Sequence, residues 1–174
     1  MYHKILVALD NSPTSDALFA QALELAQATQ GQLLLVHSLS NQEESSPLPM
    51  SGKLDSIYWA PGTELDLEAW RQDWVRYAAE SLDRLRHQAA KANTVGISTE
   101  VRQLIGDPAA TICKAAQAWG ADLILIGTRG RTGLAEWVLG SISNDVMHRA
   151  PCSVLVVKSP VTAVPPAPAM TSAV

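Results

Sequence analysis

A segment rich in glycine and serine, residues 127–143, carries the residue types that bind phosphate. Glycines allow backbone N–H groups to approach an anion closely, and they adopt positive φ without strain. A helix is predicted to begin inside the segment, and its first N–H groups and the positive end of its dipole would point at the same anion. The residues that we expect to contact phosphates are Gly127, Thr128, Arg129, Gly130, Gly140, Ser141, Ile142 and Ser143.

The spacing of these glycines excludes two common phosphate loops. A Walker A loop ends in Gly-Lys-Ser or Gly-Lys-Thr, which this segment lacks, and the dinucleotide-binding fingerprint has a different spacing. Taken by itself, the segment predicts an anion or phosphate site. An ordinary glycine-rich connecting loop remains the alternative.

Three apolar runs, residues 5–9, 32–39 and 122–127, predict strands that are buried on both faces, as in a parallel sheet. A further apolar run, residues 153–157, predicts the last strand of the chain. A fifth strand is predicted over residues 97–105, where apolar and polar side chains alternate as in a half-exposed strand near a sheet edge. Helical patterns separate the strands, so the chain is predicted to adopt an α/β fold with helices on both faces of a parallel sheet.

Capping residues predict where two of the helices begin and end. The dipeptides Ser12-Pro and Asp107-Pro each combine an N-cap residue with a proline in the first helical position. Gly31 and Gly120 are expected to end the same two helices, because glycine readily adopts the left-handed conformation found there.

A long amphipathic helix is predicted to follow a loop over residues 40–65. Its apolar stripe includes Trp70, Trp74 and Tyr77. We interpret the stripe as a helix face that packs on the sheet, rather than as a cofactor site, because helical spacing alone explains it. Residues 159–174, rich in proline and alanine, are predicted to form a disordered tail.

Composition narrows the class of protein. The 174 residues suffice for one domain with a sizeable core, and the formal net charge of -4 provides no overall basic field that would attract nucleic acid. No apolar stretch is long enough to cross a bilayer, and no targeting segment is evident. Cys113 and Cys152 are expected to be reduced thiols. We therefore expect a cytoplasmic protein that binds neither membranes nor nucleic acid.

The glycine spacing resembles the nucleotide loop of the universal stress protein family, which has Gly, two residues, Gly, nine residues, then Gly followed by Ser or Thr. Gly127, Gly130, Gly140 and Ser141 stand at these positions. The similarity covers one domain, residues 1–158, apart from the predicted loop. The other segments similar to the family, in the same order along the chain, are residues 5–12, 106–108, 122–127 and 149–157.

The resemblance implies an open, Rossmann-like sheet of five parallel strands in the order 3-2-1-4-5, numbered along the chain. Ligands of such sheets bind at the strand ends where the order reverses, which here lies between strands 1 and 4. Asp10 follows the first strand and Gly127 ends the fourth. Two motifs far apart in the sequence would therefore converge on one crevice.

The resemblance also implies roles for the individual residues. Asp10, in a turn with Asn11 and Ser12, would lie near the sugar and a metal ion, and the backbone at His37 and Ser38 would meet the adenine. Alternatives remain, because Asp10 could be a plain helix cap and His37 a strand-end residue without a direct role. Asn11 replaces a glycine that the family often has, and asparagine tolerates positive φ better than most residues, so we expect the turn to be kept.

The resemblance implies ATP as the ligand, with AMP or ADP as alternatives and Mg²⁺ or Mn²⁺ at Asp10. It also implies a homodimer in which strand 153–157, otherwise an exposed edge, pairs with its copy. We expect an ATP-binding stress-response regulator, because no residue has a specific signal for a catalytic base, and we interpret His148 as a surface or packing residue. A slow Mg²⁺-dependent ATPase and an interaction module that binds no nucleotide are the alternatives.

Overall fold

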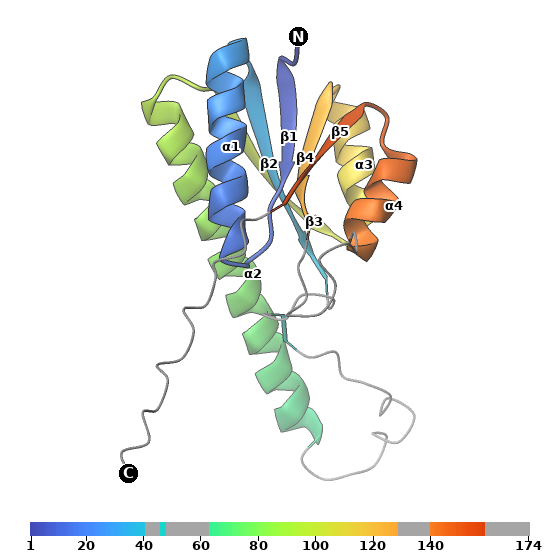
Figure 1. Ribbon diagram of the computed structural model, residues 1–174. Helices are drawn as coiled ribbons and strands as arrows, with labels where there is room; N and C mark the ends of the chain where they lie inside the picture. The colour runs from blue at the N-terminus through green and yellow to red at the C-terminus, as the bar shows by residue number, and fades with distance from the viewer. Residues whose placement is uncertain (41–45, 48–62, 129–139, 159–174) are drawn as a thin grey trace, which may run out of the picture.

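Five parallel strands form one sheet at the centre of the molecule, in the order β3-β2-β1-β4-β5 (Figure 1). The computed structural model describes residues 1–40, 46–47, 63–128 and 140–158, and side chains from residue 67 onward in the long helix. The strands are β1 (Lys4–Ala8), β2 (Gln32–Leu39), β3 (Thr99–Ile105), β4 (Leu123–Gly127) and β5 (Ser153–Val157). The helices are α1 (Thr14–Thr29), α2 (Thr63–Thr94), α3 (Pro108–Trp119) and α4 (Ser141–Arg149). The predicted fold class, strand order and edge position of the third strand are confirmed.

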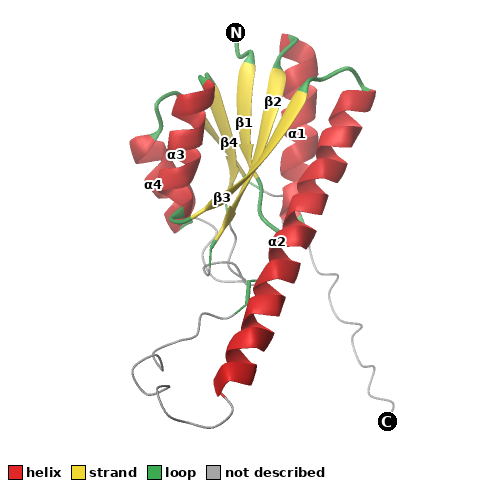
Figure 2. Cartoon of the chain, turned by 180° about the vertical axis from the view of Figure 1, so that it is seen from behind, coloured by secondary structure: helices red, strands yellow, loops and turns green. Residues whose placement is uncertain are grey.

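Two separate hydrophobic clusters lie on the two faces of the sheet. Because successive side chains of a strand point to opposite faces, Ile5 and Val7 join the cluster under α1 and α2, whereas Leu6 joins the cluster under α3 and α4. Figure 2 shows the two helix pairs on opposite sides of the strands. The central strands are therefore buried on both faces, as their continuous apolar runs predict.

Two predicted boundaries of α1 are wrong. Pro13, and not Ser12, occupies the N-cap position, because the backbone N–H and hydroxyl of Ser12 both donate to the carboxylate of Asp10. At the other end, Gln30 adopts the left-handed conformation with φ of 51°. A Cβ atom on Gly31 would lie 3.1 Å from the carbonyl oxygen of His3, so this glycine permits a close backbone approach instead.

The predicted boundaries of α3 are confirmed. The carboxylate of Asp107 accepts a hydrogen bond of 2.9 Å from the backbone N–H of Ala110, and Pro108 is the first helical residue. Gly120 ends the helix with φ of 71°, a conformation that favours glycine.

Helix α2 extends well beyond the sheet at the carboxyl ends of the strands (Figures 1 and 2). A helix of 32 residues is about 48 Å long, whereas the 8 residues of β2 span about 26 Å, so the sheet cannot cover the whole helix. Leu85 and Ala89 are buried against the sheet, but Leu67 is 43% exposed, and Trp70 and Trp74 stack on each other. Our interpretation of the stripe as a sheet-packing face is thus correct only for the part of α2 that follows these tryptophans.

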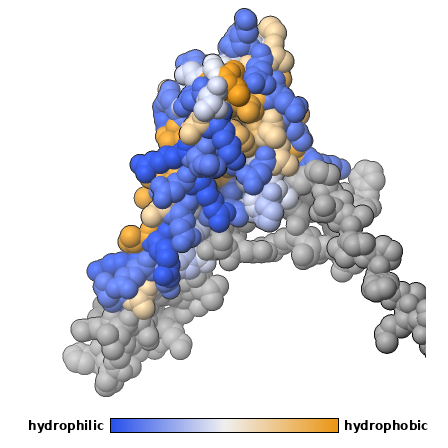
Figure 3. Space-filling model, turned by 90° about the vertical axis from the view of Figure 1, so that its left-hand side faces the viewer, coloured by the Kyte–Doolittle hydropathy of each residue, from blue (hydrophilic) through white to orange (hydrophobic). Residues whose placement is uncertain are grey.

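The outer surface on the side of α1 and α2 is mainly hydrophilic, with small separate apolar patches (Figure 3). Exposed ion pairs between residues three apart line α2, such as Asp83 with Arg86. Pairs of this kind in water contribute little to stability. Over the described residues, no helix combines the length and apolar character needed to cross a membrane.

Both cysteines carry free thiols, as predicted. Cys113 is buried in α3, and Cys152 packs against the same hydrophobic cluster. Burial raises the pKa of both thiols, so they stay protonated at neutral pH and act as small apolar side chains.

We predict that Leu125→Ala, in the central strand β4, lowers the free energy of unfolding by about 2–5 kcal/mol, because its fully buried side chain leaves a cavity. Val75→Ala is the control, since Val75 is 62% exposed on α2, and its effect should stay within about 0.5 kcal/mol. Equilibrium unfolding in urea measures both. Equal losses of stability would contradict the assignment of β4 to the core.

Candidate functional site

The turn after β1 holds the carboxylate of Asp10 in one orientation. Its Oδ1 accepts hydrogen bonds from the backbone N–H of Ser12, from the Ser12 hydroxyl, and from the Ser15 hydroxyl at 2.6 Å. The Ser15 hydroxyl oxygen in turn accepts a bond of 3.0 Å from the backbone N–H of Asp10. Asp10 therefore organises its own turn and is not the N-cap of α1, which is Pro13.

Asn11 joins this turn to α2. Its side-chain Nδ2 donates to the hydroxyl of Ser81 at 2.8 Å, and a guanidinium nitrogen of Arg84 donates to its carbonyl oxygen at 3.2 Å. Asn11 has no positive φ, since Gln30 alone among the described non-glycine residues has one, so this turn does not use the conformation that asparagine tolerates. Asparagine serves here as a hydrogen-bonding side chain.

Strand pairing brings the Asp10 turn next to the end of β4, as predicted. Ala8 pairs with Ile126, so Asp10 and Gly127 lie at the same edge of the sheet, where the strand order reverses. Gly127 has no positive φ, and a Cβ atom there would make only an ordinary contact of 3.8 Å with Leu18. The backbone N–H of Thr128 donates to the carbonyl of Val157, which extends the β4–β5 pairing by one bond.

Helix α4 begins at the same edge, immediately after Gly140. The backbone N–H groups of Ser141, Ile142 and Ser143 form its first turn and have no acceptor within a helix. The φ of Gly140 is -60°, and the hydroxyl of Ser143 is buried and donates to the Gly140 carbonyl, so Ser143 offers a ligand its backbone N–H and not its hydroxyl proton.

Two of the predicted phosphate-binding residues, Arg129 and Gly130, lie outside the described residues. The described part of the segment, residues 127–128 and 140–143, is divided between the end of β4 and the start of α4. This part supplies backbone N–H groups and the exposed side chain of Ser141.

The end of β2 contributes two buried side chains that point to opposite faces. His37 is 2% exposed and packs edge-on against Tyr77 of α2, with ring centroids 6.0 Å apart. The hydroxyl of Ser38 lies on the α3 side, 3.2 Å from the hydroxyl of Thr111. Both side chains are thus engaged in packing, which favours a role for the backbone at this strand end over a role for the imidazole.

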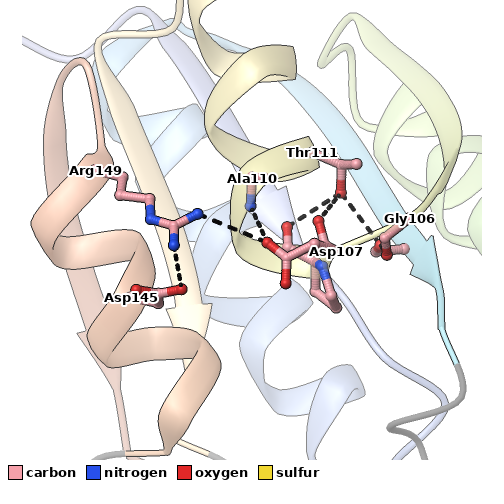
Figure 4. Close-up of polar contacts among 8 residues, drawn as sticks. Gly106, Asp107, Ala110, Thr111, Asp145 and Arg149 are labelled. Atoms are coloured by element: carbon pink, nitrogen blue, oxygen red, sulfur yellow. Dashed lines mark hydrogen bonds and ion pairs between the residues drawn. The ribbon is translucent and has the colours of Figure 1, made fainter.

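Residues 106–108 lie at the start of α3, and an ion pair connects them to α4 (Figure 4). Gly106 has φ of 126°, a conformation that favours glycine, and it leads into the α3 cap formed by Asp107. The capping carboxylate also lies 3.8 Å from a guanidinium nitrogen of Arg149, which pairs with Asp145 at 3.1 Å. Asp107 therefore contacts the last residue of α4, whereas the candidate site lies at the first turn of that helix.

Asp10 is the residue here that could meet a metal ion. The described residues contain no group of three or more His, Cys, Asp or Glu side chains placed to hold one. Mg²⁺ is commonly bound through one or two carboxylates together with phosphate oxygens and water, so a single aspartate fits a metal that arrives with a nucleotide. His148 is exposed on α4, as interpreted from the sequence.

Three residues that shape the site do not figure among those predicted from the sequence. Ser15 lies five residues after Asp10, and a hydroxyl at that distance in a helix start was a detectable signal. Ser81 and Arg84 are about 70 residues away in the sequence, and nothing in their own segment indicates a partner in the Asp10 turn.

Comparison with known proteins identifies relatives along nearly the whole described chain. The sequence model described as "Universal stress protein family" matches residues 1–158. Universal stress protein Slr1101 of Synechocystis sp. is 41% identical over 107 residues, which cover 62% of this chain and 99% of that protein. Universal stress protein YxiE of Bacillus subtilis is 30% identical over 158 residues, which cover 91% of this chain and 100% of that protein.

A solved structure is similar in fold. The universal stress protein from Archaeoglobus fulgidus in complex with dAMP superposes with a TM-score of 0.57 at 22% identity. The match covers 90% of this chain and 98% of that one.

We predict that Asp107→Ala lowers the free energy of unfolding by about 1 kcal/mol, because α3 loses its N-cap. Arg149→Ala should cost less than about 0.5 kcal/mol, since both partners of that ion pair are more than half exposed. Asp107→Asn is the matched control, because asparagine caps as well but carries no charge. Urea unfolding measures all three, and an Asn variant as unstable as the Ala variant would show that the ion pair dominates.

Proposed function

The chain belongs to the universal stress protein family, and from this premise we propose that it binds an adenine nucleotide, ATP first of all, and acts as a nucleotide-dependent regulator in the stress response. One observation carries the proposal. The Asp10 turn and the first turn of α4 lie at the same edge of the sheet, at the reversal of strand order. A carboxylate and a set of helix N–H groups are thus available to the two ends of one nucleotide.

The phosphates are proposed to bind at the first turn of α4. The N–H groups of Ser141, Ile142 and Ser143 point out of the helix start, where the dipole also favours negative charge. The hydroxyl of Ser141 adds a donor. In this proposal the remaining contacts come from Gly127, the last residue of β4, and from the three residues that follow it, Thr128, Arg129 and Gly130.

The sugar is proposed to meet Asp10, with Asn11 and Ser12 beside it. A carboxylate held by Ser12 and Ser15 suits an acceptor of ribose hydroxyl bonds, and it can also share a Mg²⁺ or Mn²⁺ ion with the phosphates. The adenine would then lie against the backbone of His37 and Ser38 at the end of the neighbouring strand β2. The dAMP complex of the Archaeoglobus fulgidus neighbour supports an adenine nucleotide as the ligand class, and AMP and ADP are the alternatives to ATP.

We propose binding without efficient hydrolysis. The Oδ1 atom of Asp10 already accepts three hydrogen bonds, an arrangement suited to a fixed acceptor or metal ligand more than to a base that takes up a proton. A cytoplasmic location is part of the same proposal, since reduced thiols such as Cys113 persist in that compartment.

We also propose that the protein forms a homodimer through β5. This strand is at the edge of the described sheet, pairs with β4, and leaves Leu155 44% exposed. An unpaired edge of this kind invites further pairing, and a second β5 would extend the sheet across both chains.

Isothermal titration with ATP and with AMP tests nucleotide binding. We expect the wild type to bind both, and Asp10→Ala to lose about tenfold or more in affinity, because a hydrogen bond to a charged group contributes about 1.5–3 kcal/mol. Asp83→Ala is the control, because it removes an acidic side chain that is 75% exposed on α2. Folded wild-type protein that releases no heat with either nucleotide would favour an interaction module that binds no nucleotide.

Sedimentation equilibrium at micromolar concentration tests the dimer. We expect the wild type to have twice the mass of one chain and Leu155→Lys to shift it toward the monomer, because two lysines would face each other across the joined strands. Val75→Lys places the same charge on the 62% exposed Val75 of α2 and should leave the mass unchanged. A wild-type mass of a single chain would refute the dimer.

A further inference from the structure

The turn that carries Asp10 is fastened to α2, a helix that holds none of the proposed nucleotide contacts. We propose that Ser81 of α2 is a positioning residue for the nucleotide site, and that it acts through Asn11. The inference rests on the proposed function. It goes further by naming a residue 70 positions from the Asp10 turn that sets how well the turn binds the nucleotide.

The hydroxyl of Ser81 has its hydrogen-bonding geometry fixed on both sides. It donates to the carbonyl oxygen of Tyr77 at 2.7 Å and accepts from Nδ2 of Asn11 at 2.8 Å. A hydroxyl has one proton to donate, so the bond to Tyr77 directs a lone pair of the oxygen to the amide of Asn11. Ser81 is 1% exposed, so its hydroxyl bonds to protein groups and is shielded from bulk water.

A second residue of α2 holds the same loop residue. Arg84 lies three positions after Ser81, on the same side of the helix, and donates to the backbone carbonyl of Asn11. Asn11 is thus fixed at its side chain by Ser81 and at its backbone by Arg84. Arg84 is exposed and Ser81 is buried, so of the two bonds the one to Ser81 is the less accessible to water and restricts the loop more strongly.

The position of Asn11 affects one of the three hydrogen bonds that hold the Asp10 carboxylate. The bond from the Ser12 backbone N–H to Oδ1 of Asp10 closes a short ring that runs through Asn11. A rotation of the Asn11 backbone would therefore move the Ser12 N–H away from the carboxylate. Two hydrogen bonds thus connect α2 to the site. The first joins the Ser81 hydroxyl to the Asn11 amide, and the second joins the Ser12 backbone N–H, next to Asn11, to the Asp10 carboxylate.

The test compares nucleotide affinity in Ser81→Ala, Asn11→Ala and the double variant. Each single variant should weaken ATP binding about fivefold, the equivalent of one ordinary hydrogen bond. If Ser81 acts through Asn11, the double variant should be no weaker than the weaker single variant, because the two changes remove the same link. A double variant whose loss is the product of the two single losses would overturn the inference.

Thr29→Val is the matched control. The Thr29 hydroxyl also donates to the carbonyl four residues earlier in its helix and is 7% exposed, but it lies at the end of α1 remote from the Asp10 turn. The control should lose stability as Ser81→Ala does and keep the wild-type affinity for ATP. Equal losses of affinity in the two variants would reduce the role of Ser81 to general stability and overturn the inference.

Hydrogen exchange of the nucleotide-free protein gives a second readout. We expect the Ser12 amide to exchange about fivefold faster in Ser81→Ala than in the wild type or Thr29→Val, because its bond to Asp10 becomes weaker. Unchanged exchange would overturn the link between α2 and the turn. If Ser81→Ala keeps the wild-type affinity while Asp10→Ala binds weakly, the inference is refuted and the proposed function is not. If the wild type binds neither ATP nor AMP, both the proposed function and the inference are refuted.

Discussion

The parallel pairing of β1 with β4 is the constraint on which the rest of the site depends. All five strands run in one direction, so every connection from a strand to the following helix starts at the same edge of the sheet. Between β1 and β4 the strand order reverses, and the connections from these two strands lead to helices on opposite faces. The Asp10 turn and the start of α4 thus lie at the reversal of strand order, which is where ligands bind in open α/β sheets. The hydrophobic clusters under the two helix pairs maintain this arrangement.

The polar groups that follow β1 and those that follow β4 are positioned by different means. On the β4 side, the geometry of α4 itself presents three N–H groups, and the Ser143 hydroxyl reinforces the helix start through the Gly140 carbonyl. On the β1 side, Asp10 lies in the turn before α1, and the orientation of its carboxylate depends on individual bonds from Ser12 and from Ser15 in the first turn of α1. The β1 side is therefore the more sensitive of the two to single substitutions. If a substitution removes a side-chain hydrogen bond to Asp10, no row of equivalent backbone N–H groups, such as α4 provides, lies in the turn to replace it.

The sequence predicts the fold better than the details of the site. Buried parallel strands and the edge-like third strand are visible because their apolar patterns reflect burial directly, and Asp107 and Gly120 are visible because helix caps are local. Ser12 misled the same reasoning, since a nearby carboxylate competes with the helix for its N–H and hydroxyl. The link from Asn11 to Ser81 could not be predicted at all, because it depends on how α2 lies beside the turn that precedes α1.

Helix α2 contacts both strand ends that the proposed nucleotide would span. Through Ser81 it holds the turn after β1, and through Tyr77 it packs on His37 near the end of β2. Tyr77 and Ser81 are four residues apart and joined by the Ser81 hydroxyl bond, so the two contacts cannot move independently. From Tyr77 the aromatic contacts continue to Trp74 and Trp70, on the part of α2 that the sheet does not cover. Helix α2 therefore connects the turn after β1 and the end of β2 with the part of its own length that extends beyond the sheet.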